Sequence, residues 1–175
     1  MPVVLGEDIV PAVQTCMNSD PYARIARFYD PATRAALGPL RRRIGELCRE
    51  MGAGRILDLG CGTGLQLLEL RRRGCWSVGT ESSPAMLARA TSLSPRFPLI
   101  RTDAQLPFAD RSFDLAILSL VLHETLGDPD LLLMEALRVA PKSIVLEWRM
   151  PERNLDLLLQ PAVHAIERLA GKEHY

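Results

Sequence analysis

The stretch Asp58-Leu59-Gly60-Cys61-Gly62-Thr63-Gly64 decides the fold, because a short apolar run leads into it and a helical pattern follows it. Residues 55–59 predict a buried strand, and residues 65–73 predict a helix that Gly74 ends in the C′ position. Glycines allow the backbone to approach a ligand closely, and the start of a helix offers free N–H groups to an anion. The stretch therefore predicts a strand-loop-helix unit that holds a nucleotide-like ligand.

The same alternation of strand and helix continues toward the C-terminus. Further strands are predicted at residues 76–80, 99–101, 115–120 and 143–147, and further helices at residues 84–91 and 129–139. Two of these helices have clear starts, because Ser83-Pro84 and Asp128-Pro129 each pair an N-cap oxygen with proline at the first helical position. Strands that alternate with helices predict an α/β fold with a parallel sheet covered on both faces.

The N-terminal part also has a helical pattern, over residues 21–51, interrupted near Asp30-Pro31 and Gly38-Pro39. We interpret residues 1–51 as an N-terminal helical cap and residues 52–175 as the ligand-binding domain, together forming one structural unit. Near the other end, residues 155–170 carry apolar side chains at helical spacing, which predicts a last helix.

Composition narrows the classes of partner. The 21 basic residues equal the 21 acidic ones, which argues against nucleic acid as a partner, and we interpret the triplets Arg41-Arg42-Arg43 and Arg71-Arg72-Arg73 as solvated helix faces. The 4 cysteines form no C-x-x-C pair, the first residues show no basic leader, and no apolar run approaches the ~20 residues of a membrane span. We therefore expect a soluble, cytoplasmic protein without a membrane span.

The spacing of the glycines, and Asp58 before them, narrow the choice of ligand. A nicotinamide dinucleotide site needs G-x-G-x-x-G or A, but Leu65 stands three places after Gly62, and the third glycine comes early at Gly64. Asp58 would repel a pyrophosphate and attract a cation. S-adenosylmethionine carries an ammonium and a sulfonium, together with a carboxylate that the helix N-terminus can accept.

Two further segments match this interpretation. Glu81 ends the second predicted strand 23 residues after Asp58 (81 − 58), near the ~20 expected for a ribose-binding acid, and Asp103-Ala104-Gln105 joins the third and fourth strands. With the glycine stretch, these segments resemble the class I S-adenosylmethionine-dependent methyltransferases, in the group that includes the ubiquinone and menaquinone C-methyltransferases. The resemblance spans residues 22–147. It implies a Rossmann-like three-layer α/β/α sandwich with a parallel sheet of strand order 3-2-1-4-5.

The resemblance also implies which residues contact the cofactor, S-adenosylmethionine. Glu81 would bind the ribose hydroxyls, Met86 would pack near the adenine, and Asp103 would accept from the adenine amino group. The expected cofactor-binding residues are Asp58, Gly60, Cys61, Gly62, Gly64, Glu81, Ser82, Met86, Asp103, Ala104, Gln105 and Ser119. Taken alone, Asp103 could be a turn residue, Glu81 a strand-end carboxylate and the glycines a tight turn, so the assignment depends on their joint order and spacing.

Methyl transfer to a small organic acceptor is the activity that the resemblance implies. His123 lies in a stretch that resembles the family's V-L-H-H segment beside the methyl-transfer pocket, although it could instead cap a backbone carbonyl. Tyr29 belongs to a family-like Y-D element that folds over the cofactor, with core packing as the alternative. Alignment of the reacting atoms at ~3–3.5 Å can suffice for this reaction. His123, or more weakly Glu124 or Glu147, is the candidate base, and no metal is expected.

The C-terminal end departs from the family pattern. Family members continue with one more helix and two antiparallel strands, which are absent here, so the chain is either truncated or naturally short. The edge of the strand at residues 143–147 would then need cover, from the final helix or from a second copy in a homodimer. This end favours an alternative function, a cofactor-binding module without turnover. A nicotinamide oxidoreductase is a third class, disfavoured by Asp58.

Overall fold

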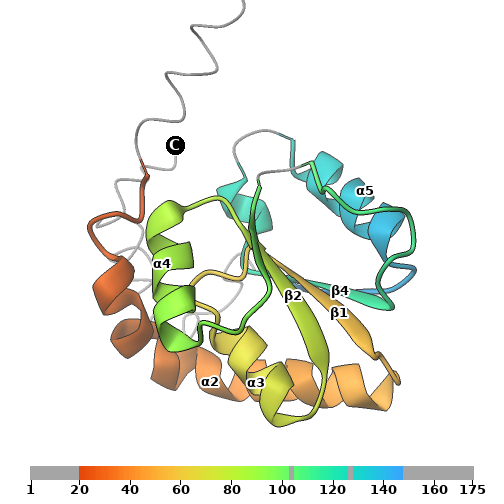
Figure 1. Ribbon diagram of the computed structural model, residues 1–175, viewed down its shortest axis with the longest axis horizontal. Coiled ribbons are helices and arrows are strands. Elements are labelled where there is room, and N and C mark those ends of the chain that lie inside the picture. Colours follow the sequence, from red (N-terminus) through yellow and green to blue (C-terminus); the bar gives the residue numbers. More distant parts are fainter. Residues whose placement is uncertain (1–19, 103–104, 126–127, 148–175) are drawn as a thin grey trace, which may run out of the picture.

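The structure is a computed structural model of the chain, and it describes residues 20–102, 105–125 and 128–147. Helices and strands alternate through these residues (Figure 1). The strands are β1 (Arg55–Leu59), β2 (Trp76–Glu81), β3 (Leu99–Arg101), β4 (Leu115–Ser119) and β5 (Ser143–Leu146). The helices are α2 (Ala26–Glu50), α3 (Leu65–Arg72), α4 (Pro84–Leu93), the 3-10 helix η2 (Leu122–Glu124) and α5 (Pro129–Val139).

The five strands form one parallel sheet in the order β3-β2-β1-β4-β5, which confirms the expected order. β1 lies in the middle, where Leu57 is opposite Val78 of β2 and Ala116 of β4. Central strands of a parallel sheet are buried on both faces, which explains the continuous apolar runs that predicted them. All strands point the same way, so their carboxyl ends meet at one edge of the sheet, and the glycine loop follows β1 at that edge.

Helices cover both faces of the sheet and complete the expected three-layer α/β/α sandwich (Figure 1). One face is covered by α2 and α3, whose Ile44, Cys48 and Leu70 pack with Ile56, Leu115 and Ile117 of the strands. The other face is covered by α5, whose Leu132, Ala136 and Val139 pack with Leu57, Leu59, Ala116 and Leu118.

The helix α2 differs from the sequence expectation. An interruption near Pro31 and Pro39 was expected, but one helix of 25 residues runs through both prolines, so that prediction is wrong. Each proline removes one backbone N–H donor, yet its fixed φ suits a helix. The side chain of Thr33 donates to the carbonyl of Tyr29 at 2.9 Å, and the C-terminal half is held by burial of Ile44 and Cys48. Tertiary packing thus overrides the local signal.

The predicted helix caps are confirmed. The Ser83 hydroxyl accepts from the N–H of Met86 at 3.1 Å, and the Asp128 carboxylate accepts from the N–H of Asp130 at 2.9 Å. The start of α4 has a second cap from the N-terminal segment. The Asp20 carboxylate accepts from the Ser83 hydroxyl at 2.8 Å and from the N–H of Ala85 at 2.9 Å. This contact fixes the segment before α2 against α4.

Some expectations fall outside the described residues. The predicted helix at 155–170 is one of them, so the cover of the β5 edge stays a prediction, whether by this helix or by a second copy. Within the described ranges, β5 pairs only with β4, and Val145 on β5 is 46% exposed. The division into a cap and a sheet domain at residue 52 also stays a prediction. No helix in the described part of the chain has the length and apolar character to cross a membrane.

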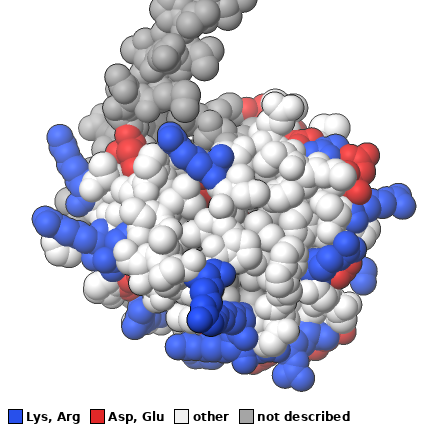
Figure 2. Space-filling view, viewed as in Figure 1, with Lys and Arg blue, Asp and Glu red and all other residues white. Residues whose placement is uncertain are grey.

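Charged side chains surround a largely uncharged area on the face shown in Figure 2. Arginines gather along its lower rim, over α2 and α3. Four members of the two triplets, Arg42, Arg43, Arg71 and Arg72, are exposed, as the solvated-face interpretation predicts. The side chain of Arg73 is only 20% exposed, so the interpretation is wrong for this residue. Acidic side chains stand among them, because Arg43 pairs with Glu46 and Glu50, and Arg72 pairs with Glu69.

Candidate functional site

A cleft with a cavity volume of about 60 Å³, open to solvent, lies at the carboxyl edge of the sheet. Ligands of open parallel sheets bind at this edge, near the point where the strand order reverses. The cleft lies between the glycine loop, helix α2 and the ends of β4 and β5. Its lining residues are Tyr29, Leu37, Leu40, Arg41, Asp58, Gly60, Cys61, Gly62, Thr63, Leu65, Gln66, Ser119, Leu120 and Leu146.

The glycine loop lines the cleft, and its backbone has a conformation that favours glycine. Gly60, Gly62 and Gly64 have φ angles of +66°, +53° and +81°. A Cβ atom at Gly60 would lie 2.4 Å from Cγ2 of Val121, so this glycine also allows a close approach to the segment after β4. A Cβ atom at Gly62 would meet no atom of the described residues within 4 Å, so these residues leave the backbone there open to a ligand.

Replacement of Gly60 by alanine is expected to destabilise the protein more than replacement of Gly52. Both residues have a φ of +66°, but a Cβ atom at Gly52 would meet nothing within 4 Å in the described part of the chain. Gly52→Ala should therefore cost about 1 kcal/mol of left-handed strain, while Gly60→Ala should cost about 3 kcal/mol through its overlap with Val121. Urea unfolding measures the difference, and Val121→Ala should recover part of it. Equal losses in the two variants would contradict the close approach.

Glu81 connects the glycine loop to the start of α4. Its carboxylate lies at the end of β2 and is 9% exposed. One oxygen accepts from the N–H of Gly62 at 2.9 Å, and the other accepts from the N–H of Ser83 at 2.9 Å. The Glu81 carboxylate therefore holds two segments beside the predicted nucleoside site, the glycine loop and the residue before α4.

Asp58 is the most unusual titratable group of the cleft. Its side chain is 2% exposed, and Oδ2 has no hydrogen-bond partner among the described residues. Burial raises the pKa of Asp58 to about 7, the charge of Arg41 opposes this rise, and the charge of Glu81 adds to it. A buried carboxylate oxygen without a partner is costly. The site therefore favours a cation or a hydrogen-bond donor at this oxygen.

Arg41 and Gln66 line the cleft as well, and the sequence predictions missed both of them. For Arg41 the solvated-face interpretation is wrong, because its side chain is half-buried and burial lowers its pKa. Helical spacing could have predicted this burial, because position 41 lies on the same side of the helix as the apolar residues Leu37 and Ile44. Gln66 is 5% exposed, and its Oε1 has no partner within the described ranges.

The segment before and at the start of α2 closes one side of the site. Tyr29 lines the cleft and meets Tyr22 edge to face, with ring centroids 6.1 Å apart. The hydroxyl of Thr63 in the glycine loop donates to the buried Asp30 carboxylate. Met86, expected near the adenine, is 2% exposed and packs with Tyr22 and the first residues of α2. It does not line the cleft.

His123 is paired with Glu147, a contact that the sequence did not predict. Nδ1 of His123 lies 2.6 Å from Oε1 of Glu147, and Oε2 accepts from the N–H of Leu122 at 3.1 Å. Each side chain is about one quarter exposed, at 24% and 26%. Because a carboxylate only accepts, the contact places a proton on Nδ1 and makes Nε2 the accepting nitrogen of the neutral ring. The pair stands beyond the ends of β4 and β5.

The other candidate residues lie in several places. Ser119 and Cys61 line the cleft, and the N–H of Cys61 donates to the carbonyl of Thr80 at 2.9 Å. Ser82 and Gln105 are exposed. Asp103, Ala104 and the side chain of Glu124 lie outside the described residues.

Known proteins show the same organisation. A family model described as a methyltransferase domain matches residues 57–144. A demethylmenaquinone methyltransferase of Mycolicibacterium paratuberculosis is 34% identical over 134 residues, which cover 74% of this chain and 52% of the relative. The protein of the same name from Tropheryma whipplei is 34% identical over 145 residues, which cover 75% of this chain and 59% of the relative. The chain thus spans between half and three fifths of the length of these two relatives.

Solved structures agree in fold. A putative S-adenosylmethionine-dependent methyltransferase of Methanococcus maripaludis superimposes with a TM-score of 0.60 at 19% identity, covering 82% of this chain and 69% of that one. The PH0226 protein of Pyrococcus horikoshii gives a TM-score of 0.54 at 25% identity, covering 87% and 65%. The glycine loop, the strand order and the family match agree, and the chain belongs to the methyltransferase domain family, among the class I S-adenosylmethionine-dependent methyltransferases.

Proposed function

We propose that the chain binds S-adenosylmethionine in the cleft and transfers its methyl group to a small organic acceptor. The observation that carries this proposal is the buried Asp58 carboxylate, whose Oδ2 is unpaired among the described residues, directly before the glycine loop. The ammonium of S-adenosylmethionine would satisfy this oxygen, whereas the pyrophosphate of a dinucleotide would be repelled by it.

The other parts of the cleft fit the rest of the cofactor. The open backbone at Gly62 allows a ligand to lie against the loop, and Glu81, bonded to the N–H of Gly62, is the carboxylate that we assign to the ribose hydroxyls. The first N–H groups of α3 face the same loop and favour an anionic group.

The bound cofactor would supply a methyl group on a positively charged sulfur. The contribution of the chain is to hold the acceptor in line with that methyl group and to exclude water. We assign the His123–Glu147 pair to the acceptor side, because it follows the cleft-lining residues Leu120 and Leu146 in the chain. Nε2 of His123 would take the proton when the acceptor atom is a hydroxyl or an amine.

The lining of the cleft supports an acceptor with an apolar body. Leu37 and Leu40 of α2, Leu65 of α3, and Leu120 and Leu146 beyond the strand ends form the apolar part of the wall. The curated relatives are named for demethylmenaquinone, so a quinol is the first acceptor to test.

Calorimetric titration of the full chain with S-adenosylhomocysteine, and with NAD as the control, tests the binding part of the proposal. We expect binding of S-adenosylhomocysteine and none of NAD, because Asp58 repels a pyrophosphate. NAD binding without a response to S-adenosylhomocysteine would overturn the proposal.

Transfer of a labelled methyl group to a panel of quinols, phenols and small amines then tests turnover. Label in one of these acceptors supports the enzyme. Binding without transfer to any acceptor of the panel would favour the alternative, a cofactor-binding module without turnover.

A further inference from the structure

The first part of α2 and the turn before it carry an excess of positive charge. Residues 21–42 contain five arginines and a single acid, Asp30, which is buried and accepts from Thr63 of the glycine loop. The whole chain, by contrast, has equal numbers of basic and acidic residues. Four of the five arginines are exposed, at positions 24, 27, 34 and 42. A local positive surface is therefore present on a chain without net charge.

Apolar side chains stand between these arginines. Phe28 is 58% exposed, and the guanidinium carbon of Arg27 lies 4.5 Å from the centroid of its ring. Pro31 and Ala35 are exposed as well, three and seven residues after Phe28. Helical spacing places all of these side chains on the outer side of the helix, away from the buried Ile44. We call this surface the arginine face, and it consists of Arg24, Arg27, Phe28, Pro31, Arg34, Ala35 and Arg42.

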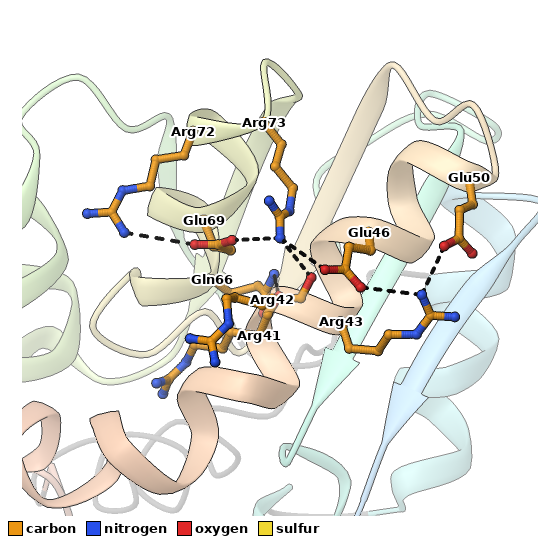
Figure 3. A network of polar contacts seen from close by, with 9 residues as sticks. All are labelled: Arg41, Arg42, Arg43, Glu46, Glu50, Gln66, Glu69, Arg72 and Arg73. Carbon is orange, nitrogen blue, oxygen red and sulfur yellow. Dashed lines mark hydrogen bonds and ion pairs between the residues drawn. The ribbon is translucent and has the colours of Figure 1, made fainter.

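The later part of α2 is different, because acidic side chains balance its arginines. Residues 43–51 contain two arginines and two glutamates. Arg43 pairs with Glu46 at 3.4 Å and with Glu50 at 2.9 Å, and Arg73 of the neighbouring segment pairs with Glu46 at 3.6 Å (Figure 3). Arg42 joins this network through its backbone carbonyl, which accepts from Arg73 at 3.2 Å, and its side chain is exposed (Figure 3). The excess charge therefore belongs to the part of the helix beside the cleft.

The arginine face and the cleft use opposite sides of the same helix. Tyr29, which follows Phe28, lines the cleft, and so do Leu37 and Leu40. Leu40 is 39% exposed, so the apolar lining of the cleft continues to the surface. A helix with its side chains is about 10–12 Å across. A surface that contacts the arginine face would thus lie about one helix diameter from the apolar wall of the cleft.

We propose that the arginine face docks on an anionic phospholipid membrane. Guanidinium groups bind lipid phosphates, and an exposed aromatic ring between them enters the boundary of the acyl chains. Nucleic acid offers the same phosphates without an apolar layer, so the exposed Phe28 and Pro31 favour the membrane. An acceptor with an apolar body partitions into a bilayer, and docking would bring the cleft to it. This last step rests on the proposed function, whereas membrane binding itself does not.

Sedimentation of the full chain with phospholipid vesicles tests the proposal. We expect binding to vesicles of phosphatidylcholine mixed with phosphatidylglycerol, at least about 10-fold tighter than to phosphatidylcholine alone, since each arginine near an anionic surface contributes about fivefold. The double variant Arg27→Gln with Arg34→Gln should therefore bind the mixed vesicles about 25-fold more weakly. Phe28→Ser should weaken binding about 5- to 10-fold through its lost apolar contact. All the changed side chains are exposed, so thermal unfolding should match the wild type.

The double variant Arg111→Gln with Lys142→Gln is the matched control. It removes the same charge from two exposed positions before β4 and β5, at the amino edge of the sheet, and should bind the mixed vesicles as the wild type does. Equal weakening in this control would mean that overall charge, and not the arginine face, attracts the vesicles.

Two further results would overturn the proposal. One is the absence of binding to the mixed vesicles, or binding that neither arginine-face variant changes. The other is binding of duplex RNA that depends on Arg27 and Arg34 but not on Phe28, without vesicle binding, which would assign the face to nucleic acid. Because the vesicle assay needs neither cofactor nor acceptor, its failure leaves the proposed methyl transfer standing. Failure to bind S-adenosylhomocysteine would refute that function and leave the vesicle result unchanged.

Discussion

Asp58→Asn is expected to stabilise the ligand-free protein at pH 8 and to weaken its binding of S-adenosylhomocysteine. The wild-type carboxylate is charged at that pH although it is buried and its Oδ2 lacks a partner among the described residues. Asparagine removes the charge and keeps the shape. We expect a gain of about 1–3 kcal/mol in the free energy of unfolding, because the buried amide retains part of the desolvation cost.

The pH dependence of this gain follows from the raised pKa of Asp58, about 7 in the folded protein. Between the ordinary pKa of an aspartate and pH 7, the folded state binds more protons than the unfolded state, so this group lowers the stability as the pH rises. The difference in the free energy of unfolding between the variant and the wild type should therefore begin to rise at about pH 4, increase until about pH 7 and stay constant above it. Thermal unfolding across this range measures it.

Binding should change in the opposite direction. Loss of the charge that faces the ammonium is expected to weaken S-adenosylhomocysteine about 10- to 100-fold. In the wild type, binding below pH 7 should release up to one proton, which calorimetry in buffers of different ionisation enthalpy detects. The variant should release none from this group. Wild-type affinity in Asp58→Asn would contradict the role of this carboxylate.

Asp114 offers a matched control of opposite sign. It is partly exposed, and hydrogen bonds from the N–H of Arg55, from the guanidinium of Arg55 and from the N–H of Gly54 lower its pKa. Its contribution to stability is present above the ordinary pKa and is lost as the pH falls through the lowered value. Asp114→Asn should therefore lower the stability at pH 8 and leave ligand binding unchanged.

His123→Ala is expected to reduce methyl transfer by about 100-fold or more, the usual contribution of a positioned general base. The loss should appear in kcat, because a general base acts in the transfer step and not in the binding of the cofactor. The measurement is single-turnover transfer of a labelled methyl group to the acceptor found in the screen. Affinity for S-adenosylhomocysteine should stay within about twofold of the wild type, far below the hundredfold loss in rate.

Two further variants separate proton transfer from a structural role of His123. His123→Gln can still donate a hydrogen bond to Glu147 but cannot take a proton, so it should be as slow as the alanine variant. Glu147→Gln should shift the pH profile of turnover, because the carboxylate holds the imidazole through Nδ1. Normal turnover in His123→Gln would assign His123 to packing alone.

Much of the fold could be predicted because its signals are local. The strand at Arg55–Leu59 and the helix at Pro129–Val139 form with the expected bounds, since buried parallel strands are continuous apolar runs and the Asp128 cap marks a helix start. The course of α2 through Pro39 was missed, because packing over its whole length outweighs a local penalty.

The candidate site was predicted less completely, because several of its residues are brought together only by tertiary packing. The glycine loop and Asp58 are contiguous in the chain, so their proximity follows from the sequence. Arg41 reaches the cleft only through the packing of α2 on α3, and the pairing of His123 with Glu147 depends on two neighbouring strand ends. Such tertiary contacts leave little trace in a single sequence.

The double cap on α4 has a practical consequence. Because the Asp20 carboxylate is bonded to the Ser83 hydroxyl, and the N–H of Ser83 is bonded to Glu81, the segment from Asp20 to Ala26 is linked to the carboxylate that we propose for the ribose. A fusion joint, an epitope or a protease site placed in that segment would break the hydrogen bonds between Asp20 and the start of α4. It would thereby disturb the Glu81 carboxylate, more than fifty positions further along the chain. Those who prepare shortened forms of this protein should therefore keep Asp20.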